Sequence, residues 1–286
     1  MLFCIIGAGA VGSVLAYVAE LRGCSVRLYS RSEGLRYVKA PAGTLTLNAE
    51  GPPWRPTQCD YMLLAVKAYD TRRALEMART FRVASPILLV VQNGLGGLEE
   101  AESMGFNVAG GVADFGAFRR GALVELRGTG RLIVGCRGRD CSSELAGLRS
   151  CLDSPLFRVE IVDDIEPYRW LKLAVNAAVN SIATLLEAPN GVVAHNPNAR
   201  RAALIIAEEV ERIAHEKGIR LPAKASLETI RVAESTSENI NSLLQDIELG
   251  RRTEVDYILG PLAASSRLIE LVYHLLKSLE EERRGL

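Results

Sequence analysis

Three polar side chains recur at four-residue steps inside one apolar stretch of the sequence. They are Lys172, Asn176 and Asn180, in the segment YRWLKLAVNAAVN. In an α-helix each step of four residues overshoots a full turn by about 40°, so the three side chains would form a slightly slanted row on one face. An ammonium group can donate a proton, and two amides can bind oxygen atoms. The partners of this polar row could be protein, water or a ligand.

The positions around this row, Leu171, 173–175 and 177–179, are apolar, which indicates that the helix is mostly buried and that its polar row needs partners. Two interpretations stay open from this segment alone. The asparagines could bond neighbouring helices while the lysine extends to solvent. Alternatively, the three side chains could belong to a functional site, where buried polar and charged groups often gather.

Length and composition exclude several classes of partner. The chain has 286 residues, enough for two domains, and its 34 basic and 34 acidic residues are interspersed. The sequence shows no cluster of basic residues that would predict nucleic-acid binding. No apolar run in it approaches the ~20 residues that span a bilayer. The N-terminus lacks the basic start of a signal peptide. We therefore expect a cytoplasmic protein that binds a small molecule, with no nucleic-acid or membrane partner.

The six cysteines and three histidines show no zinc-ligand spacing. We interpret the cysteines as small buried thiols, assign them no function and predict no metal site. A Cys136–Cys141 disulfide would be expected only in an oxidising or extreme-thermophile setting.

A glycine-rich turn lies between a predicted strand, Leu2 to Ile6, and a predicted helix, Ser13 to Arg22. Its residue types fit a dinucleotide, because the first glycine makes the tight turn, the second lets the backbone approach a pyrophosphate, and the third allows close helix packing. A second strand, Ser25 to Tyr29, follows the helix. This order favours dinucleotide binding over a plain glycine turn, with these cofactor contacts: Gly7, Ala8, Gly9, Ala10, Val11 and Gly12.

Ser30 and Arg31 follow the second strand, where an acidic residue would bind the ribose 2′-hydroxyl of NAD. A hydroxyl and a guanidinium suit a 2′-phosphate instead, so this pair favours NADP (NADPH). The alternative is that Arg31 is a solvent-exposed loop residue.

Two further predicted strands end in polar residues. The strand Tyr61 to Val66 leads into Lys67, and the strand Pro86 to Val91 leads into Asn93 within QNGLGG. Ligands bind at the carboxyl ends of strands in an open parallel sheet, so both side chains are candidate ligand contacts. Each also has a simpler interpretation, as an exposed strand end and as a turn asparagine.

The strand pattern ends after a last predicted strand, Arg158 to Val162, and only helices follow Asp164. Asn196-Pro197 predicts the start of a helix that runs to about Glu216, and Pro222 and the segment 239–250 predict two more starts. A final amphipathic helix is expected over 266–282. The predicted fold class is α/β, with an N-terminal Rossmann-type doubly wound sheet that binds NADP (1–163) and an all-α C-terminal domain (164–286), to which the family resemblance described next assigns substrate binding and catalysis.

Seven sequence motifs together resemble the ketopantoate reductase (2-dehydropantoate 2-reductase) family. In the family's order and over nearly the full chain they are GAGAVG, the strand ending in Lys67, QNGLG, WLKLxxNxxxN, APNG, NSLLQDI and RRTEVDYILG. The resemblance implies NADPH-dependent reduction of 2-dehydropantoate to (R)-pantoate, a step toward pantothenate and coenzyme A. It also implies that the substrate binds in a cleft between the two domains.

The resemblance assigns roles residue by residue. Lys172 matches the proton donor, and Glu254 matches a carboxylate near the lysine and the nicotinamide ribose, so both are expected to be catalytic. The expected substrate contacts are Asn93, Asn176, Asn180, Asn190, Asn239, Asn241 and Ser242. The expected cofactor contacts beyond the glycine turn are Ser30, Arg31, Lys67, Asn93, Ala117 and Glu254.

Two alternative functions remain. One is a related two-domain NAD(P)-dependent reductase that acts on another 2-keto or hydroxy acid. The other is a non-catalytic NADP-binding regulator, which the presence of Lys172 and Glu254 disfavours. The apolar faces of the terminal helices would suit a homodimer.

Overall fold

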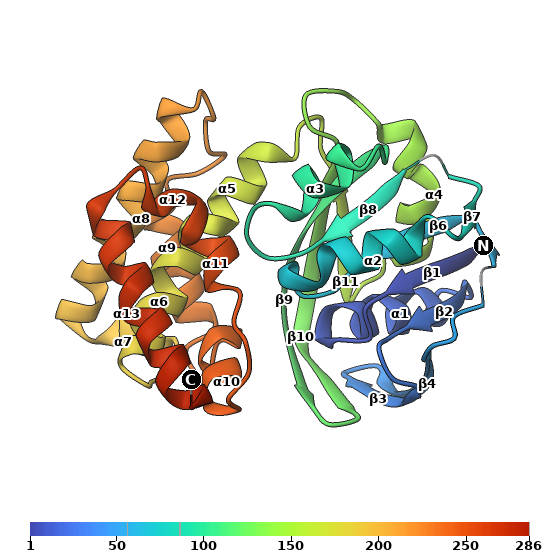
Figure 1. Ribbon diagram of the computed structural model, residues 1–286, viewed down its shortest axis with the longest axis horizontal. Helices are drawn as coiled ribbons and strands as arrows, with labels where there is room; N and C mark the ends of the chain where they lie inside the picture. Colours follow the sequence, from blue (N-terminus) through green and yellow to red (C-terminus); the bar gives the residue numbers. More distant parts are fainter. Residues whose placement is uncertain (56, 86, 286) are drawn as a thin grey trace. The chain divides into compact units, whose positions relative to one another are not determined.

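The structure, a computed structural model, describes residues 1–55, 57–85 and 87–285. The chain divides into two compact units, coloured by sequence in Figure 1. The first unit comprises residues 1–92 and 96–166, and the second comprises residues 93–95 and 167–286. The short segment 93–95 therefore belongs with the C-terminal part of the chain.

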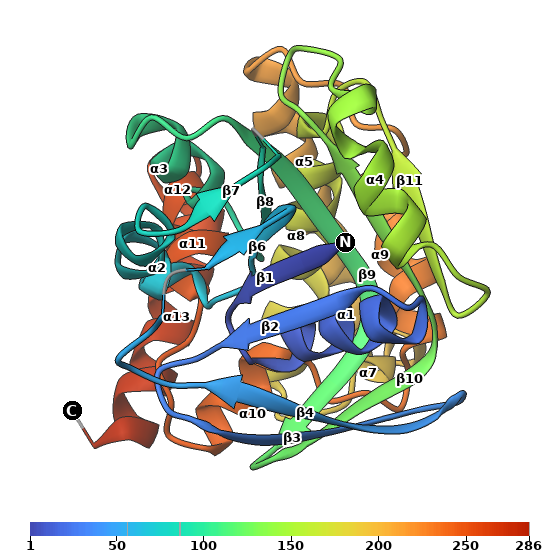
Figure 2. The ribbon, with the colours of Figure 1, turned by 90° about the vertical axis from the view of Figure 1, so that its right-hand side faces the viewer.

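The first unit is built on a nine-stranded mixed sheet, in the order β11-β10-β3-β4-β2-β1-β6-β8-β9. Strands β9 and β10 form a long antiparallel hairpin, and β10 also pairs with β3, so the sheet closes on itself (Figure 2). The bounds are β1 Leu2–Ile6, β2 Ser25–Tyr29, β3 Gly34–Ala40, β4 Gly43–Glu50, β6 Tyr61–Leu64, β8 Leu88–Val91, β9 Val108–Arg120, β10 Leu123–Gly135 and β11 Phe157–Ile161; β5 Gln58–Cys59 and β7 Arg82–Val83 form a separate pair.

Helices pack on both faces of the central parallel strands. Along β1, Phe3 and Ile5 join the core beneath α1 and α4, whereas Cys4 and Ile6 join a second core beneath α2 and α3. This alternation is that of a strand buried on both faces. The predicted doubly wound α/β class is confirmed, with helices α1 Ala10–Leu21, α2 Thr71–Ala78, α3 Gly97–Ser103 and α4 Ser142–Leu152, and a 3₁₀ turn η1 Ala68–Asp70.

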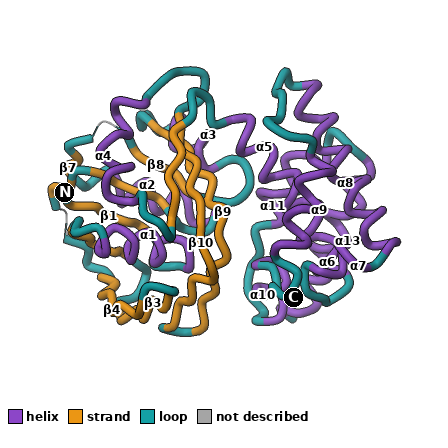
Figure 3. The backbone as a smooth tube through the Cα atoms, turned by 180° about the vertical axis from the view of Figure 1, so that it is seen from behind, coloured by secondary structure: helices purple, strands orange, loops and turns teal. Residues whose placement is uncertain are grey.

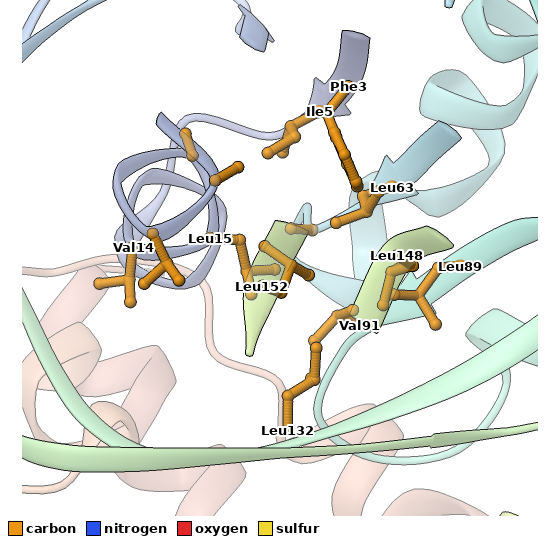
Figure 4. Packing of buried hydrophobic residues seen from close by; sticks show 14 of the residues in the cluster. Phe3, Ile5, Val14, Leu15, Leu63, Leu89, Val91, Leu132, Leu148 and Leu152 are labelled. Carbon is orange, nitrogen blue, oxygen red and sulfur yellow. The ribbon is translucent and has the colours of Figure 1, made fainter. Parts of the chain in front are cut away.

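Helix α1 is buried on all sides over residues 12–19. Val14 and Leu15 pack in one apolar cluster with Leu63 of the parallel sheet and Leu132 of the hairpin (Figure 4). The closed sheet therefore surrounds this helix, which explains why it shows no polar face.

Some predicted strand boundaries are wrong, and three strands, β3, β5 and β7, were not predicted. Strand β6 ends at Leu64 rather than Val66, and β8 begins at Leu88; Pro86 lies outside the described residues. Strand β3, Gly34–Ala40, was not predicted, because its inward-facing positions include Arg36 and give no apolar alternation.

The described residues of the second unit form helices joined by loops, without a strand, as predicted (Figure 3). Asn196 caps α8 by accepting hydrogen bonds from the backbone N–H groups of Asn198 and Ala199. Helix α9 begins at Ala225, three residues after the predicted start. The bounds are α5 Glu166–Val175, α6 Ser181–Leu185, α7 Gly191–His195, α8 Pro197–Glu216, α9 Ala225–Ser235, α10 Ser242–Glu248, α11 Val255–Ile258, α12 Gly260–Ala263 and α13 Arg267–Arg284, with a π-helical turn η2 Asn176–Asn180. Among the described helices, none has the length and apolar character needed to cross a membrane.

Four of the six cysteines form disulfides, so their interpretation as thiols was wrong. Cys24, after α1, bonds Cys151 at the end of α4, and Cys136 bonds Cys141. Cys4 and Cys59 are free and buried. A pair 127 residues apart cannot be read from spacing, because it depends on how α1 and α4 pack.

Candidate functional site

The polar row predicted over Lys172, Asn176 and Asn180 lies on one continuous helical segment of the second unit. Lys172 is in the last turn of α5, and the two asparagines bound the π-helical turn. The prediction of an unbroken α-helix is wrong at this turn. Wide turns of this kind occur frequently at functional sites.

The π-helical turn changes the geometry of the row. With i→i+5 hydrogen bonds a turn holds more than four residues, so the step from Asn176 to Asn180 falls short of a full turn. The preceding step from Lys172 is α-helical and overshoots. The overshoot of the first step and the shortfall of the second rotate the side chains in opposite directions. The three side chains therefore line up more closely than they would on a regular α-helix. The neighbouring residues 173–175 and 177–179 are all buried and apolar, so the polar side chains stand out from an apolar core.

The segment 93–95 is fastened to the second unit next to Glu254. The backbone N–H of Leu95 donates to the carbonyl of Tyr257 at 2.9 Å. Gly94 has φ +79°, and an added Cβ would lie 2.4 Å from the Tyr257 oxygen, so only glycine fits. The Asn93 side chain then reaches Glu254, its Nδ2 donating to Oε2 at 3.4 Å. Two residues assigned roles by separate motifs are thereby brought together.

Polar side chains next to Glu254, which is itself 5% exposed, form hydrogen bonds to α13 on both sides of it, one of them buried and one partly buried. Thr253 donates from Oγ1 to Glu280 at 2.7 Å, and Tyr273 donates to Asp256 at 2.9 Å. Burial acts to raise the pKa of Asp256, but hydrogen bonding from Tyr273 and the charge of Lys277 keep that pKa below its usual value. Sequence reasoning missed this support; its signal was the polar residues that flank Glu254 in RRTEVDYILG.

The predicted substrate asparagines near α7 and α10 have structural bonds as well. Asn190 donates from Nδ2 to Thr236 at 2.9 Å and from its backbone N–H to the carbonyl of Asn239 at 3.0 Å. Asn241 caps α10 through Oδ1, and Ser242 is the exposed first residue of that helix. Among the described residues, Asn190 Oδ1 and Asn241 Nδ2 are buried without a partner. One acceptor and one donor thus remain for a ligand or water.

The glycine turn in the first unit fits a dinucleotide cofactor. Gly7 has φ +120°, and a Cβ there would lie 2.5 Å from the Ala65 backbone. A Cβ on Gly12 would lie 1.9 Å from the Gly7 oxygen, whereas one on Gly9 would meet no described atom within 4 Å. Tight packing beneath the turn and open space at Gly9, the N-cap of α1, are what a phosphate needs to approach the helix N-terminus.

The remaining predicted cofactor residues of the first unit follow β2 or β6, or lie on β9. Arg31 is 69% exposed and forms an ion pair with Asp70 at 3.4 Å. The Ser30 hydroxyl donates to the carbonyl of Ser32. Lys67 precedes η1, and Ala117 lies half-buried on β9. The predicted cofactor set is thus divided, since Asn93 and Glu254 belong to the second unit.

One group of potential metal ligands exists among the described residues. Ligand atoms of Cys136, Cys141 and Glu144 lie within 4.8 Å of one another. The two sulfurs are joined in a disulfide, so neither offers a thiolate.

Comparison with known proteins covers nearly the whole chain. Residues 3–139 match the family model "Ketopantoate reductase PanE/ApbA", and residues 164–280 match "Ketopantoate reductase PanE/ApbA C terminal". The chain is 35% identical to the 2-dehydropantoate 2-reductase of Pyrobaculum aerophilum, over 96% of this chain and 97% of that one.

Solved structures agree. A crystal structure of 2-dehydropantoate 2-reductase from Geobacter metallireducens is similar with a TM-score of 0.84 and 25% identity, over 97% of this chain and 99% of that one. A dimeric ketopantoate reductase from Staphylococcus aureus has a TM-score of 0.85 at 20% identity, over 99% of this chain and 100% of that one. The latter similarity concerns the fold.

Proposed function

Because this chain belongs to the ketopantoate reductase family, we propose that it reduces 2-dehydropantoate to (R)-pantoate with NADPH, in the biosynthesis of pantothenate and coenzyme A. The observation that carries the proposal is the row of Lys172, Asn176 and Asn180, which rises from an otherwise apolar helical segment. Such a row suits a small, oxygen-rich ketoacid.

Lys172 is the proposed proton donor. Bound NADPH supplies the hydride that reduces the ketone carbon of the substrate. The ketone oxygen gains negative charge as this happens, and the Lys172 ammonium both stabilises that charge and transfers a proton to the oxygen. The product is a hydroxyl group, and the lysine recovers its proton from solvent. Histidine is not required for this chemistry.

The amides position the substrate in this proposal. Asn176 and Asn180 lie on the lysine's helical segment and offer donors and acceptors to the substrate's hydroxyl and carboxylate oxygens. Asn190, Asn239, Asn241 and Ser242 supply further contacts. Asn93 and Glu254, which are hydrogen-bonded to each other, serve the substrate and the nicotinamide ribose. The glycine turn, Ser30, Arg31, Lys67 and Ala117 bind the rest of the cofactor.

We assign residues 1–163 to cofactor binding and residues 164–286 to substrate binding and catalysis. The NADPH preference rests on Ser30 and Arg31. The Arg31–Asp70 ion pair is largely exposed and therefore contributes little to stability, about 0–1 kcal/mol, so a 2′-phosphate could displace the carboxylate.

We further propose a cytoplasmic homodimer, by analogy with the dimeric relative.

Reduced-nicotinamide absorbance tests the function directly. Purified protein is mixed with NADPH or NADH and one of three ketoacids: 2-dehydropantoate, the analogue without its hydroxymethyl group, and an aromatic 2-ketoacid. The proposal predicts fastest turnover with 2-dehydropantoate and NADPH. Faster turnover of the aromatic acid would move the protein to a related reductase. Cofactor binding with no turnover of any ketoacid would support a regulator instead.

A further inference from the structure

Strand β3 buries a charged residue and exposes apolar ones. On its outer face Leu35 and Tyr37 are 45% and 41% exposed, whereas on its inner face Arg36 is only 6% exposed and lies next to the buried Val38. Arginine is rarely buried unless it is paired. A strand selected for packing alone would place the apolar residues inward, so the position of Arg36 requires another explanation.

The guanidinium of Arg36 bonds only to backbone carbonyls in the part of the chain that the structure describes. Its Nε donates to the oxygen of Ala8 at 3.1 Å, and its Nη1 donates to the oxygen of Leu35 at 2.8 Å. These bonds use two of its five N–H groups. No described carboxylate forms an ion pair with it, and burial lowers its pKa. A buried positive charge without a counter-charge is costly.

The charge lies beside the positive end of a helix. Ala8 belongs to the glycine turn, and the next residue, Gly9, is the N-cap of α1. The helix has no side-chain cap and no acidic residue in its first turn. A cation at a helix N-terminus is unfavourable, by about 0.3–1 kcal/mol at the surface. Two positive features therefore meet at one place, and an anion would stabilise both.

We infer that Arg36 binds the pyrophosphate of the dinucleotide cofactor at the N-terminus of α1. The inference rests on the proposed function. A guanidinium matches phosphate oxygens in a bidentate geometry, and the open space at Gly9 lets a phosphate approach. Arg36 is bonded to the glycine turn itself, whereas the 2′-phosphate is assigned to Ser30 and Arg31 at the end of β2.

A purely structural role is the competing explanation. Arg36 could serve to tie the glycine turn to β3 through Ala8. In that case loss of Arg36 would lower the stability of the ligand-free protein. The same loss would reduce the binding affinity for all adenine nucleotides by similar factors. A pyrophosphate contact would instead leave that stability nearly unchanged, because the variant also removes an uncompensated buried charge.

Isothermal titration of the full-length protein, without any ketoacid, distinguishes these roles. The probes are NADPH, NADH, ADP, which carries a diphosphate, and 2′-AMP, which carries only the 2′-phosphate. The variants are Arg36→Met, Arg36→Lys and the control Lys39→Gln, which removes an exposed positive charge from the same strand. Melting temperatures are measured without ligand.

We expect R36M to raise the dissociation constants for NADPH, NADH and ADP by a similar factor of about 10 to 100. Affinity for 2′-AMP should stay within about twofold, and the melting temperature within about 3 °C. R36K should give an intermediate loss for ADP, because it keeps the charge without the planar fork; it carries the comparison if R36M does not fold. K39Q should match the wild type.

Three results would overturn the inference: unchanged affinity for ADP, a loss confined to NADPH, or an equal loss for 2′-AMP together with a fall in melting temperature. A wild-type protein that binds neither ADP nor a dinucleotide would overturn the inference and the proposed function together. Failure to reduce 2-dehydropantoate with cofactor binding intact would overturn only the proposed function.

Discussion

The side-chain amide of Asn93 donates to the carboxylate of Glu254 at 3.4 Å, across 161 residues of sequence. The contact depends on Gly94, whose backbone conformation and lack of a side chain let the segment 93–95 lie against the carbonyl of Tyr257. A position that does no chemistry itself thus lets Asn93 reach Glu254.

Gly94→Ala should lower kcat/KM for 2-dehydropantoate by at least about tenfold, because the new Cβ would lie 2.4 Å from the Tyr257 oxygen and displace Asn93. Global stability should fall by about 1–3 kcal/mol from strain. The matched control is Gly105→Ala, since Gly105 has φ +83° with no described atom near its Cβ position. If both variants lose activity equally, the contact with Tyr257 is not the cause.

Lys172→Ala should lower kcat by about 10²- to 10⁴-fold, because it removes the proposed proton donor. The dissociation constant for NADPH, measured by titration, should change by less than about threefold. Lys217→Ala, which removes an exposed lysine after α8, is the control for loss of charge. Unchanged turnover in K172A would exclude the assigned role.

The two disulfides should contribute unequally to stability. Cys24–Cys151 closes a long loop, with a sequence separation of 127, so its loss should cost about 5 kcal/mol in the chain-entropy estimate. Cys136–Cys141 has a separation of 5, and its loss should cost about 2 kcal/mol. Urea denaturation of the two double Cys→Ser variants gives the comparison. Equal values, or no change on reduction of the wild type, would contradict it.

Glu209 should make the free energy of unfolding depend on pH in the acidic range. Hydrogen bonds from Arg212 and Ser266 lower the pKa of Glu209 from 4.5 to about 2. A carboxyl group whose pKa is depressed in the folded state contributes its full stabilisation of the fold above pH 4.5. That contribution is lost as the pH falls toward 2.

Glu209→Gln should therefore lower the free energy of unfolding at pH 7 by about 1 kcal/mol. The difference from wild type should shrink steadily between pH 5 and pH 3, which denaturant titration at about four pH values would measure. Glu208→Gln, an exposed neighbour on α8, is the control. A difference that does not depend on pH would exclude the ion pair as its source.

Features that depend on local chemistry were predictable from the sequence. The glycine turn between β1 and α1, and the asparagine cap of α8, follow from residue types at fixed short spacings. The lysine and asparagines of the polar row were predicted as a set because their spacing is itself the signal.

Features that depend on tertiary packing were not predictable. Strand β3 was missed because Arg36 faces inward, which no apolar pattern predicts. The π-helical turn was missed because a repeat of four residues is compatible with both α and π geometry. The Cys24–Cys151 bond and the network around Glu254 join segments far apart in the chain, so local pattern carries no signal for them.

Membership of residues 93–95 in the second unit also affects how the chain is made. A ribosome adds about 5 to 20 residues per second, so roughly 8 to 32 s separate the synthesis of Asn93 from that of Glu254, 161 residues later. During that interval the first unit can fold while residues 93–95 still lack the second-unit residues that they contact. The second unit is completed by a segment synthesised long before the rest of it, so a C-terminal fragment that begins at residue 167 would lack part of its own structure.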